Sequence, residues 1–294
     1  MGIDNNSLRF LAEAAARGVD FSRTITIGRQ NFYRLSPSSL RSGLVRAGHR
    51  VSALDAERIF SNRGIYADEL LRVLGAETLH SADYSEYENA THIFDMNRPS
   101  PPDLDQRYTL VVDGGSLEHI FNFPQAIANC MNMVAVGGHF IGLTPANNFF
   151  GHGFYQFSAE LFFRIFEECN GFALERVVLV EDDQSGRGWF EVIDPAVAKE
   201  RVTLMSATPS HLFVQARKTR HCVPFQRAPY QSDYVSTWLA EPLARGSSKS
   251  YRSPMMLLRS AGQALLPRGL KEWLRCRLFP GPRCRRDLFK PVRS

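Results

Sequence analysis

The stretch Tyr108–Pro145, which reads YTLVVDGGSLEHIFNFPQAIANCMNMVAVGGHFIGLTP, decides the fold of this chain. Its apolar run Thr109–Val112 predicts a buried strand, and Asp113 places a carboxylate where that strand ends. An acidic group in this place is typical of a parallel sheet, which binds ligands at the carboxyl ends of its strands.

The second half of the stretch predicts a helix and a further strand. The helix is expected from about Pro124 to Val134, with proline at its first position. Gly137-Gly138 is expected to turn the chain into a strand at His139–Leu143. Strand, helix and strand in this order make one βαβ unit of a parallel sheet.

Segments on both sides extend this unit. Upstream, we expect helices at 7–18, in the stretch from residue 31 through Arg50 (two or more), and at Ile65–Leu74. Strands are expected at Thr24–Ile27, Glu77–Ser81 and Ala90–Phe94. Asp83 and Asp95 lie just beyond the last two strands. Downstream, Ser158 is expected to cap a helix that Gly171 closes, followed by strands at 172–181, Trp189–Ile193, Arg201–Met205 and His211–Ala216.

This order predicts an α/β fold: a Rossmann-like, mostly parallel sheet with helices on both faces and an antiparallel pair of strands closing one edge. We assign residues 1–220 to this domain, with a helical insertion at about 31–64. Residues 221–294 form a basic, partly helical extension. Between 241 and 294 there are 13 Lys/Arg and 3 Asp/Glu, a net charge of +10, so the total of +5 leaves −5 on residues 1–240.

The extension has three interpretations: a solvated tail, an amphipathic helix at an anionic membrane surface, or a contact with a partner protein. Nucleic acid is not expected as a partner, because residues 1–240 carry a net negative charge.

The chain has no apolar run long enough to cross a bilayer and no apolar leader, and its five cysteines show no metal-ligand spacing. We therefore expect a cytoplasmic protein with reduced thiols and no metal site, peripheral at most to the inner membrane face.

The ordered motifs SAD, FDMN, VVDGGSLEHIFN, VGGHFIGLTPANN and FSAELFFRIFEECNGF resemble the class I S-adenosylmethionine-dependent methyltransferases over about residues 20–218. The resemblance implies S-adenosyl-L-methionine as cofactor. It also implies that Asp83 holds the ribose, that Asp95 and Met96 lie beside the adenine, and that Asp113 and Gly114 lie beside the methionine moiety. Leu117, Glu118 and His119 would border the substrate.

The chain departs from the family after its first strand. The family has a glycine-rich loop there, whereas this chain has only Gly28, followed by Arg29 and Gln30. Side chains at these two positions would occupy space that the cofactor takes in the family. Either Arg29 or Gln30 hydrogen-bonds the methionine carboxylate directly, or cofactor binding has been lost.

On the acceptor side, His119 and His152 are candidate catalytic bases, although a loop histidine is more often solvated or capping. The candidate substrate contacts lie in or near a loop whose aromatic side chains also suit core packing; they are Glu118, Asn147, Asn148 and Tyr155.

The serine of GGSLEH lacks a nucleophile elbow, and no dinucleotide fingerprint or phosphate loop occurs. The sequence thus predicts a methyltransferase for a small molecule, such as a sugar or polysaccharide-pathway intermediate. The alternative is a non-catalytic, methyltransferase-like binding or scaffold protein.

Overall fold

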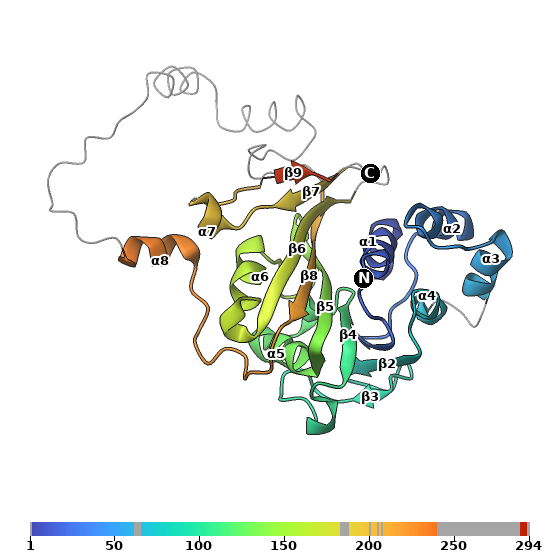
Figure 1. The fold of residues 1–294 in the computed structure, drawn as a ribbon, viewed down its shortest axis with the longest axis horizontal. Coiled ribbons are helices and arrows are strands. Elements are labelled where there is room, and N and C mark those ends of the chain that lie inside the picture. Colours follow the sequence, from blue (N-terminus) through green and yellow to red (C-terminus); the bar gives the residue numbers. More distant parts are fainter. Residues whose placement is uncertain are drawn as a thin grey trace, which may run out of the picture.

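A single sheet forms the centre of the protein (Figure 1). The structure, a computed structural model, describes residues 2–61, 66–182, 188–199, 201–204, 206, 208–239 and 289–292. Within these residues, the sheet has nine strands in the order β3-β2-β1-β4-β5-β8-β6-β7-β9.

The first five strands run parallel to one another, as predicted. They are β1 (Arg23–Ile27), β2 (Thr78–Asp83), β3 (His92–Ile93), β4 (Tyr108–Asp113) and β5 (Val134–Asn147). Every residue of β4 is buried, which explains its continuous apolar run: both faces of a central parallel strand are covered by helices.

The closing strands are antiparallel. β8 (Ser210–Lys218) lies between β5 and β6 (Phe172–Glu181), and β7 (Trp189–Val192) follows β6. β9 (Phe289–Pro291) pairs with β7, so a short piece of the expected extension belongs to the sheet. The predicted α/β fold with an antiparallel closing pair is confirmed.

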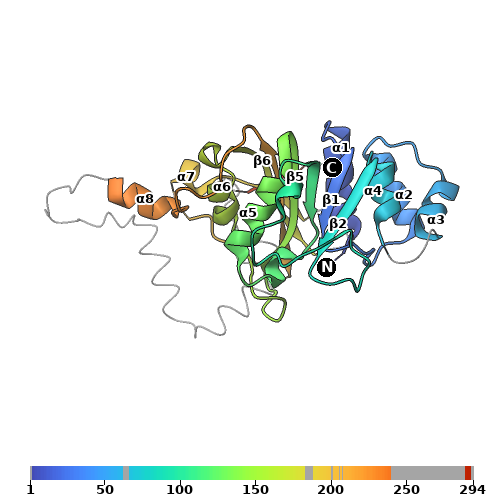
Figure 2. The same cartoon turned by 90° about the horizontal axis from the view of Figure 1, so that it is seen from below.

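Helices cover both faces of the sheet (Figures 1 and 2). On one side lie α1 (Asn5–Ala16) and α4 (Asp68–Val73), with α2 (Pro37–Arg46) and α3 (Ala53–Ser61) further out, and on the other lie α5 (Phe123–Met133) and α6 (Ala159–Ile165). Shorter helices are η1 (Pro102–Leu104), η2 (Leu117–His119), η3 (Glu168–Asn170), α7 (Pro195–Ala198) and α8 (Ser232–Leu239). Two apolar clusters, one per face, make up the core.

Local signals explain where α1 begins and what holds it on the sheet. The Asp4 carboxylate accepts a hydrogen bond from Ser7 N at 2.8 Å and caps the helix. Gly18, with φ at +89°, follows its last turn. Trp189 Nε1 donates to Asn6 Oδ1 at 2.9 Å, a buried bond that ties the helix to β7.

Three local predictions were wrong. Gly137 and Gly138 do not precede β5 but lie within it, where the pairing with β4 shifts register between Tyr108 and Leu110. A Cβ at Gly138 would lie 2.7 Å from Thr109 O, so glycine is needed there for close backbone approach. Residues 201–204 form no strand. The Ser158 side chain makes no capping hydrogen bond, and α6 ends at Ile165, before Gly171.

The amphipathic segment expected at Pro254–Phe279 lies outside the described residues, as does most of the basic extension. Among the helices that are described, none combines the length and apolar character needed to cross a membrane.

Candidate active site

The functional residues predicted at strand ends meet along the side of the sheet where the parallel strands have their carboxyl ends. This side is called the edge below. Ile27, the last residue of β1, is in register with Ala82 of β2 on one side and with Asp113 of β4 on the other. Asp83 is in register with Ile93 of β3. Gly28, Asp83, Asp95 and Asp113 therefore follow four adjacent strands at their carboxyl ends, where open parallel sheets bind ligands.

Asp113 shapes the turn after β4. Its side chain is fully buried, and Oδ1 accepts hydrogen bonds from Ser116 N at 2.8 Å and Leu117 N at 3.3 Å. Oδ2 has no hydrogen-bond partner. Burial, reinforced by the nearby Glu118 carboxylate, raises the pKa of Asp113 to about 8. Asp113 thus fixes the backbone of the turn that carries Gly114.

Asp83 and Asp95 are more accessible. Asp83 is partly exposed and accepts a hydrogen bond from Ser85 N at 3.1 Å. Asp95 Oδ1 accepts from the side chain and the backbone N of Asn97, at 2.8 and 2.9 Å, and these bonds hold the pKa of Asp95 below its usual value. The neighbouring Met96 is buried in the core. The two carboxylates remain in reach of a ligand laid along the edge.

The side chain of Gln30 lies across the end of β1, where the resemblance would place a glycine-rich loop. This side chain is buried, and its Nε2 donates to Ile27 O at 2.8 Å, which anchors it across the end of β1. Its Oε1 has no hydrogen-bond partner. This atom lies so close to Gly114 that a Cβ on residue 114 would overlap it. Gln30 therefore bridges the exits of β1 and β4.

Arg29 points to a different part of the molecule. Its Nη2 lies 2.6 Å from Asp68 Oδ2, its Nη1 donates to Glu88 O at 3.1 Å, and its guanidinium stacks on the Tyr66 ring at 4.0 Å. The hydrogen bond to Asp68 raises the pKa of Arg29. Arg29 thus ties the loop after β1 to α4, and of the two side chains only Gln30 faces the β4 turn.

We expect Gly114→Ala to lower the free energy of unfolding by about 1–3 kcal/mol, because the new methyl group overlaps an anchored, buried amide. In the Gln30→Ala background the same substitution should cost little, since the obstructing side chain is gone. Urea unfolding of the two single variants and the double variant measures this coupling. An equal cost of Gly114→Ala in both backgrounds would show that Gln30 does not occupy this place.

A cavity of about 510 Å³ lies beside this edge. Gly114 and His152 belong to its wall, together with the loop after β1 and the first residues of the chain. The full lining is Gly2, Asp4, Ser7, Asn31, Phe32, Tyr33, Gly114, Leu143, Phe149, His152, Asp182, His211 and Phe213. The cavity thus opens next to the turn that the resemblance places beside the methionine moiety.

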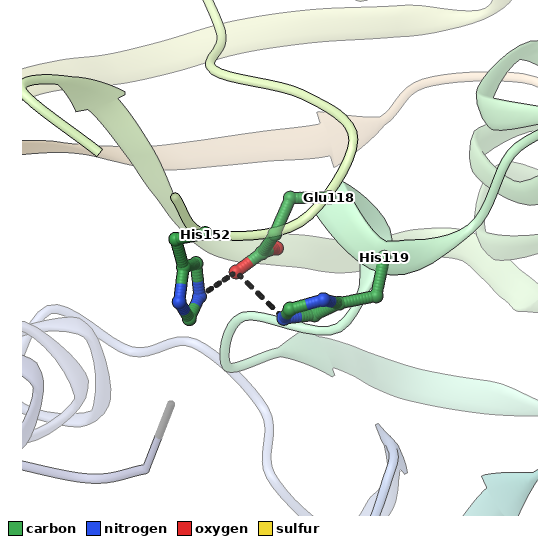
Figure 3. Close-up of side chains that lie close together, drawn as sticks. All are labelled: Glu118, His119 and His152. Atoms are coloured by element: carbon green, nitrogen blue, oxygen red, sulfur yellow. Dashed lines mark ion pairs between the residues drawn. The ribbon is translucent and has the colours of Figure 1, made fainter. Parts of the chain in front are cut away.

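Glu118 and His119 of η2 come together with His152 of the loop after β5, and of the three only His152 lines the cavity (Figure 3). Glu118 Oε1 lies 3.4 Å from His152 Nε2 and 3.9 Å from His119 Nε2. The two imidazole rings meet edge to face, with centroids 4.8 Å apart. The two predicted bases therefore share one carboxylate.

The electrostatics of this cluster follow from its burial. Glu118 is completely buried, and neither carboxylate oxygen has a hydrogen-bond partner, so its pKa is raised to about 7. Burial also lowers the pKa of His119 and of His152. Both imidazoles are therefore neutral at pH 7, the form that accepts a proton or a metal ion.

The other predicted substrate residues are held by the protein itself. Asn148 Nδ2 donates to Ser206 O at 2.9 Å and Thr208 O at 3.0 Å. The Tyr155 hydroxyl donates to Phe121 O at 2.6 Å. Asn147 pairs with Ser210 at the end of β5. None of these three is among the residues that line the cavity.

Sequence reasoning missed the part of the wall that the N-terminus supplies. Ile3 N donates to Asn31 O at 2.7 Å, and Tyr33 N donates to Ile3 O at 3.0 Å, so residues 2–4 lie against the loop after β1. This pairing joins segments far apart in the chain and leaves no local pattern. Asp182 and His211, at the ends of β6 and β8, were missed for the same reason.

The strand order and the polar strand ends define a Rossmann-like, mostly parallel sheet with antiparallel closing strands, as predicted. No family model and no curated protein matches the sequence. Among solved structures, the chain is similar to 1,6-didemethyltoxoflavin-N1-methyltransferase of Burkholderia thailandensis, with 12% identity, 73% of this chain and 80% of that chain covered, and a TM-score of 0.37. It is also similar to the N-methyltransferase NodS of Bradyrhizobium japonicum, with 13% identity, 72% and 94% covered, and a TM-score of 0.37. The fold assignment rests on the strand order and not on these similarities.

Proposed function

We propose that this protein is an S-adenosylmethionine-dependent methyltransferase that acts on a small molecule. The observation that carries the proposal is the cavity of about 510 Å³, which has Gly114 and His152 in its wall and lies beside the edge where β1, β2 and β4 end. Its volume is in the range of small-molecule sites. The cofactor edge and the acceptor cavity would then meet at the turn after β4.

The residues at the edge suit the cofactor. The partly exposed Asp83 carboxylate would accept hydrogen bonds from the ribose hydroxyls, and Asp95 and Met96 would border the adenine. The buried, unpartnered Oε1 of Gln30 offers an acceptor for the ammonium group at the amino-acid end. When bound, S-adenosylmethionine supplies an electrophilic methyl group on a sulfonium.

The chain's own contribution is to position the acceptor and, where the acceptor must lose a proton, to accept that proton. His152 lines the cavity, and its Nε2 faces Glu118 Oε1 at 3.4 Å. A neutral His152 would take the proton, and the Glu118 carboxylate would stabilise the imidazolium that results.

The charge of the cavity wall limits which molecules can bind there as methyl acceptors. Its lining includes the carboxylates of Asp4 and Asp182, and none of the described lining residues is Lys or Arg. Such a wall disfavours phosphorylated or other anionic acceptors and favours neutral ones that donate hydrogen bonds. We therefore propose a hydroxyl-bearing ring, such as a sugar without phosphate, stacked on the aromatic rings of the wall.

The position of Gln30 favours a second candidate, a non-catalytic binding protein of the same fold. Its side chain bridges the exits of β1 and β4, where the family's glycine loop lets the cofactor approach the backbone. If Gln30 stays in this place, it excludes the cofactor instead of binding it.

Thermal unfolding of the full chain with S-adenosylmethionine separates the two candidates. At a ligand concentration 100 times its Kd, a functional site stabilises the folded state by about 2.7 kcal/mol, which raises Tm by about 5 °C or more. Adenosine at the same concentration serves as the control. No shift for the wild-type protein, together with a shift for Gln30→Ala, would establish the non-catalytic candidate.

A further inference from the structure

The cluster of Glu118, His119 and His152 has a property that a proton-accepting role leaves unexplained. The Glu118 side chain is completely buried, yet neither of its oxygens has a hydrogen-bond partner. A buried carboxylate without a partner is costly, and neutral imidazoles do not compensate its charge. The Nε2 atom of His152 is also buried without a hydrogen-bond partner. A cation bound between Glu118 Oε1 and His152 Nε2 would satisfy both atoms.

The geometry points to that cation: we propose that Glu118 Oε1, His119 Nε2 and His152 Nε2 bind a divalent transition-metal ion. One ligand atom from each of the three residues lies within 4.8 Å of the others, and in Figure 3 a nitrogen of each imidazole pairs with the same Glu118 oxygen. Metal–ligand bonds of about 2.1 Å in a tetrahedron place neighbouring ligand atoms about 3.4 Å apart. The two distances from Oε1, 3.4 and 3.9 Å, are close to this value, so small side-chain rotations complete the site.

The ligand types narrow the choice of metal. Two imidazoles and one carboxylate suit Zn²⁺, Fe²⁺ or Ni²⁺, whereas Mg²⁺ and Ca²⁺ prefer oxygen ligands. No local pattern in the sequence predicts such a site, because Glu118 and His119 are adjacent while His152 comes from the loop after β5. Only the meeting of η2 with that loop brings the third ligand to the other two. Backbone bonds from Phe154 N and Tyr155 N to Glu118 O, at 2.8 and 3.2 Å, hold the two segments together.

Three protein ligands leave a position open, which is the arrangement of catalytic rather than structural metal sites. His152 also belongs to the wall of the cavity. The open position is therefore available to a water molecule or to an oxygen of a bound molecule. Metal binding itself does not depend on the proposed function. If that function holds, the open position would take the acceptor hydroxyl and lower its pKa, so that its proton passes to solvent water; His152 would then act as a metal ligand and not as the proton acceptor.

The test is calorimetric titration of the full chain, freed of metal by a chelator, with Co²⁺ and with Zn²⁺. We expect about one equivalent to bind at this site, and the visible spectrum of bound Co²⁺ to report nitrogen and oxygen ligands. Glu118→Gln and His152→Ala should each weaken Co²⁺ binding by about tenfold or more. Mg²⁺ should bind much more weakly than Zn²⁺.

Two matched controls exclude binding elsewhere. His92→Ala removes one member of the His80–His92 pair, in which the facing nitrogens lie 3.3 Å apart, and Cys169→Ser removes an exposed thiol. Both should leave the site's affinity unchanged. Unchanged Co²⁺ affinity in Glu118→Gln, or loss of the equivalent in either control, would overturn the proposal.

Folding of the variants is checked independently by circular dichroism. Glu118→Gln is nearly isosteric and removes a buried charge, so the metal-free variant should be at least as stable as the wild type. If it fails to fold, His119→Ala replaces it, since the His119 side chain is 47% exposed and truncation there leaves the core intact. Undiminished Co²⁺ binding by His119→Ala would then contradict the three-ligand site. If Co²⁺ binds but S-adenosylmethionine does not raise Tm, the proposed function is refuted and the proposal of a metal site is retained.

Discussion

Replacing Asp83 with alanine is expected to reduce strongly the stabilisation of this protein by S-adenosylmethionine while leaving the fold intact. Asp83 ends β2 with a partly exposed carboxylate, which is the group we assign to the ribose hydroxyls. Hydrogen bonds to a charged group contribute about 1.5–3 kcal/mol, so the affinity should fall by about tenfold to 150-fold. Thermal unfolding at one fixed cofactor concentration, with the wild type beside the variant, measures this loss.

Asp103→Ala provides the matched control for this experiment. Asp103 is also an acid, but it lies in η1 before β4 begins, its side chain is 70% exposed, and it pairs at the surface with Arg107. Its removal should leave the cofactor-induced shift unchanged. A full shift in Asp83→Ala would show that the ribose lies elsewhere, whereas an equal loss in both variants would point to a general effect of acidic charge.

Lys218→Met is expected to lower the free energy of unfolding by about 3 kcal/mol. Lys218 ends β8 with a side chain that is only 2% exposed. Its Nζ donates to Met131 O at 2.9 Å and Val134 O at 2.8 Å, and so satisfies carbonyl groups where α5 ends and β5 begins. A methionine fills the same space but leaves these buried carbonyls unpaired, at about 1–3 kcal/mol each.

Guanidinium unfolding of Lys218→Met and of Arg217→Met tests this role. Arg217 is the adjacent residue, 44% exposed, and pairs with Glu175 at the surface. Its loss should cost no more than about 1 kcal/mol, as for other exposed ion pairs. A cost for Lys218→Met as small as that for Arg217→Met would mean that water, and not Lys218, satisfies the end of α5.

Much of the sheet could be predicted because its elements carry local signals. The β4 strand is an unbroken apolar run, and α5 begins beside a proline and buries a stripe at helical spacing. The errors occurred where tertiary context decides. Gly137 and Gly138 lie within β5, and Gly138 lets the backbone of β5 approach Thr109 of β4 closely. A Gly-Gly pair in a strand cannot be distinguished from a Gly-Gly turn in the sequence.

The candidate site was predictable only in part. Acids at parallel strand ends share one edge by topology, so the grouping of Asp83, Asp95 and Asp113 followed from the sequence. The meeting of His152 with Glu118 and the packing of residues 2–4 against the loop after β1 depend on long-range contacts. Likewise, the sequence allowed Arg29 or Gln30 to face the cofactor, and the structure directs Arg29 to Asp68.

Cofactor binding is tested most directly by calorimetric titration of the full chain with S-adenosylhomocysteine, which would occupy the cofactor site without reacting. We expect one equivalent to bind per chain, with a Kd below about 1 mM. Absence of binding at millimolar concentration, in a protein whose unfolding transition shows that it is folded, would contradict the central claim that the edge formed by β1, β2 and β4 binds the cofactor.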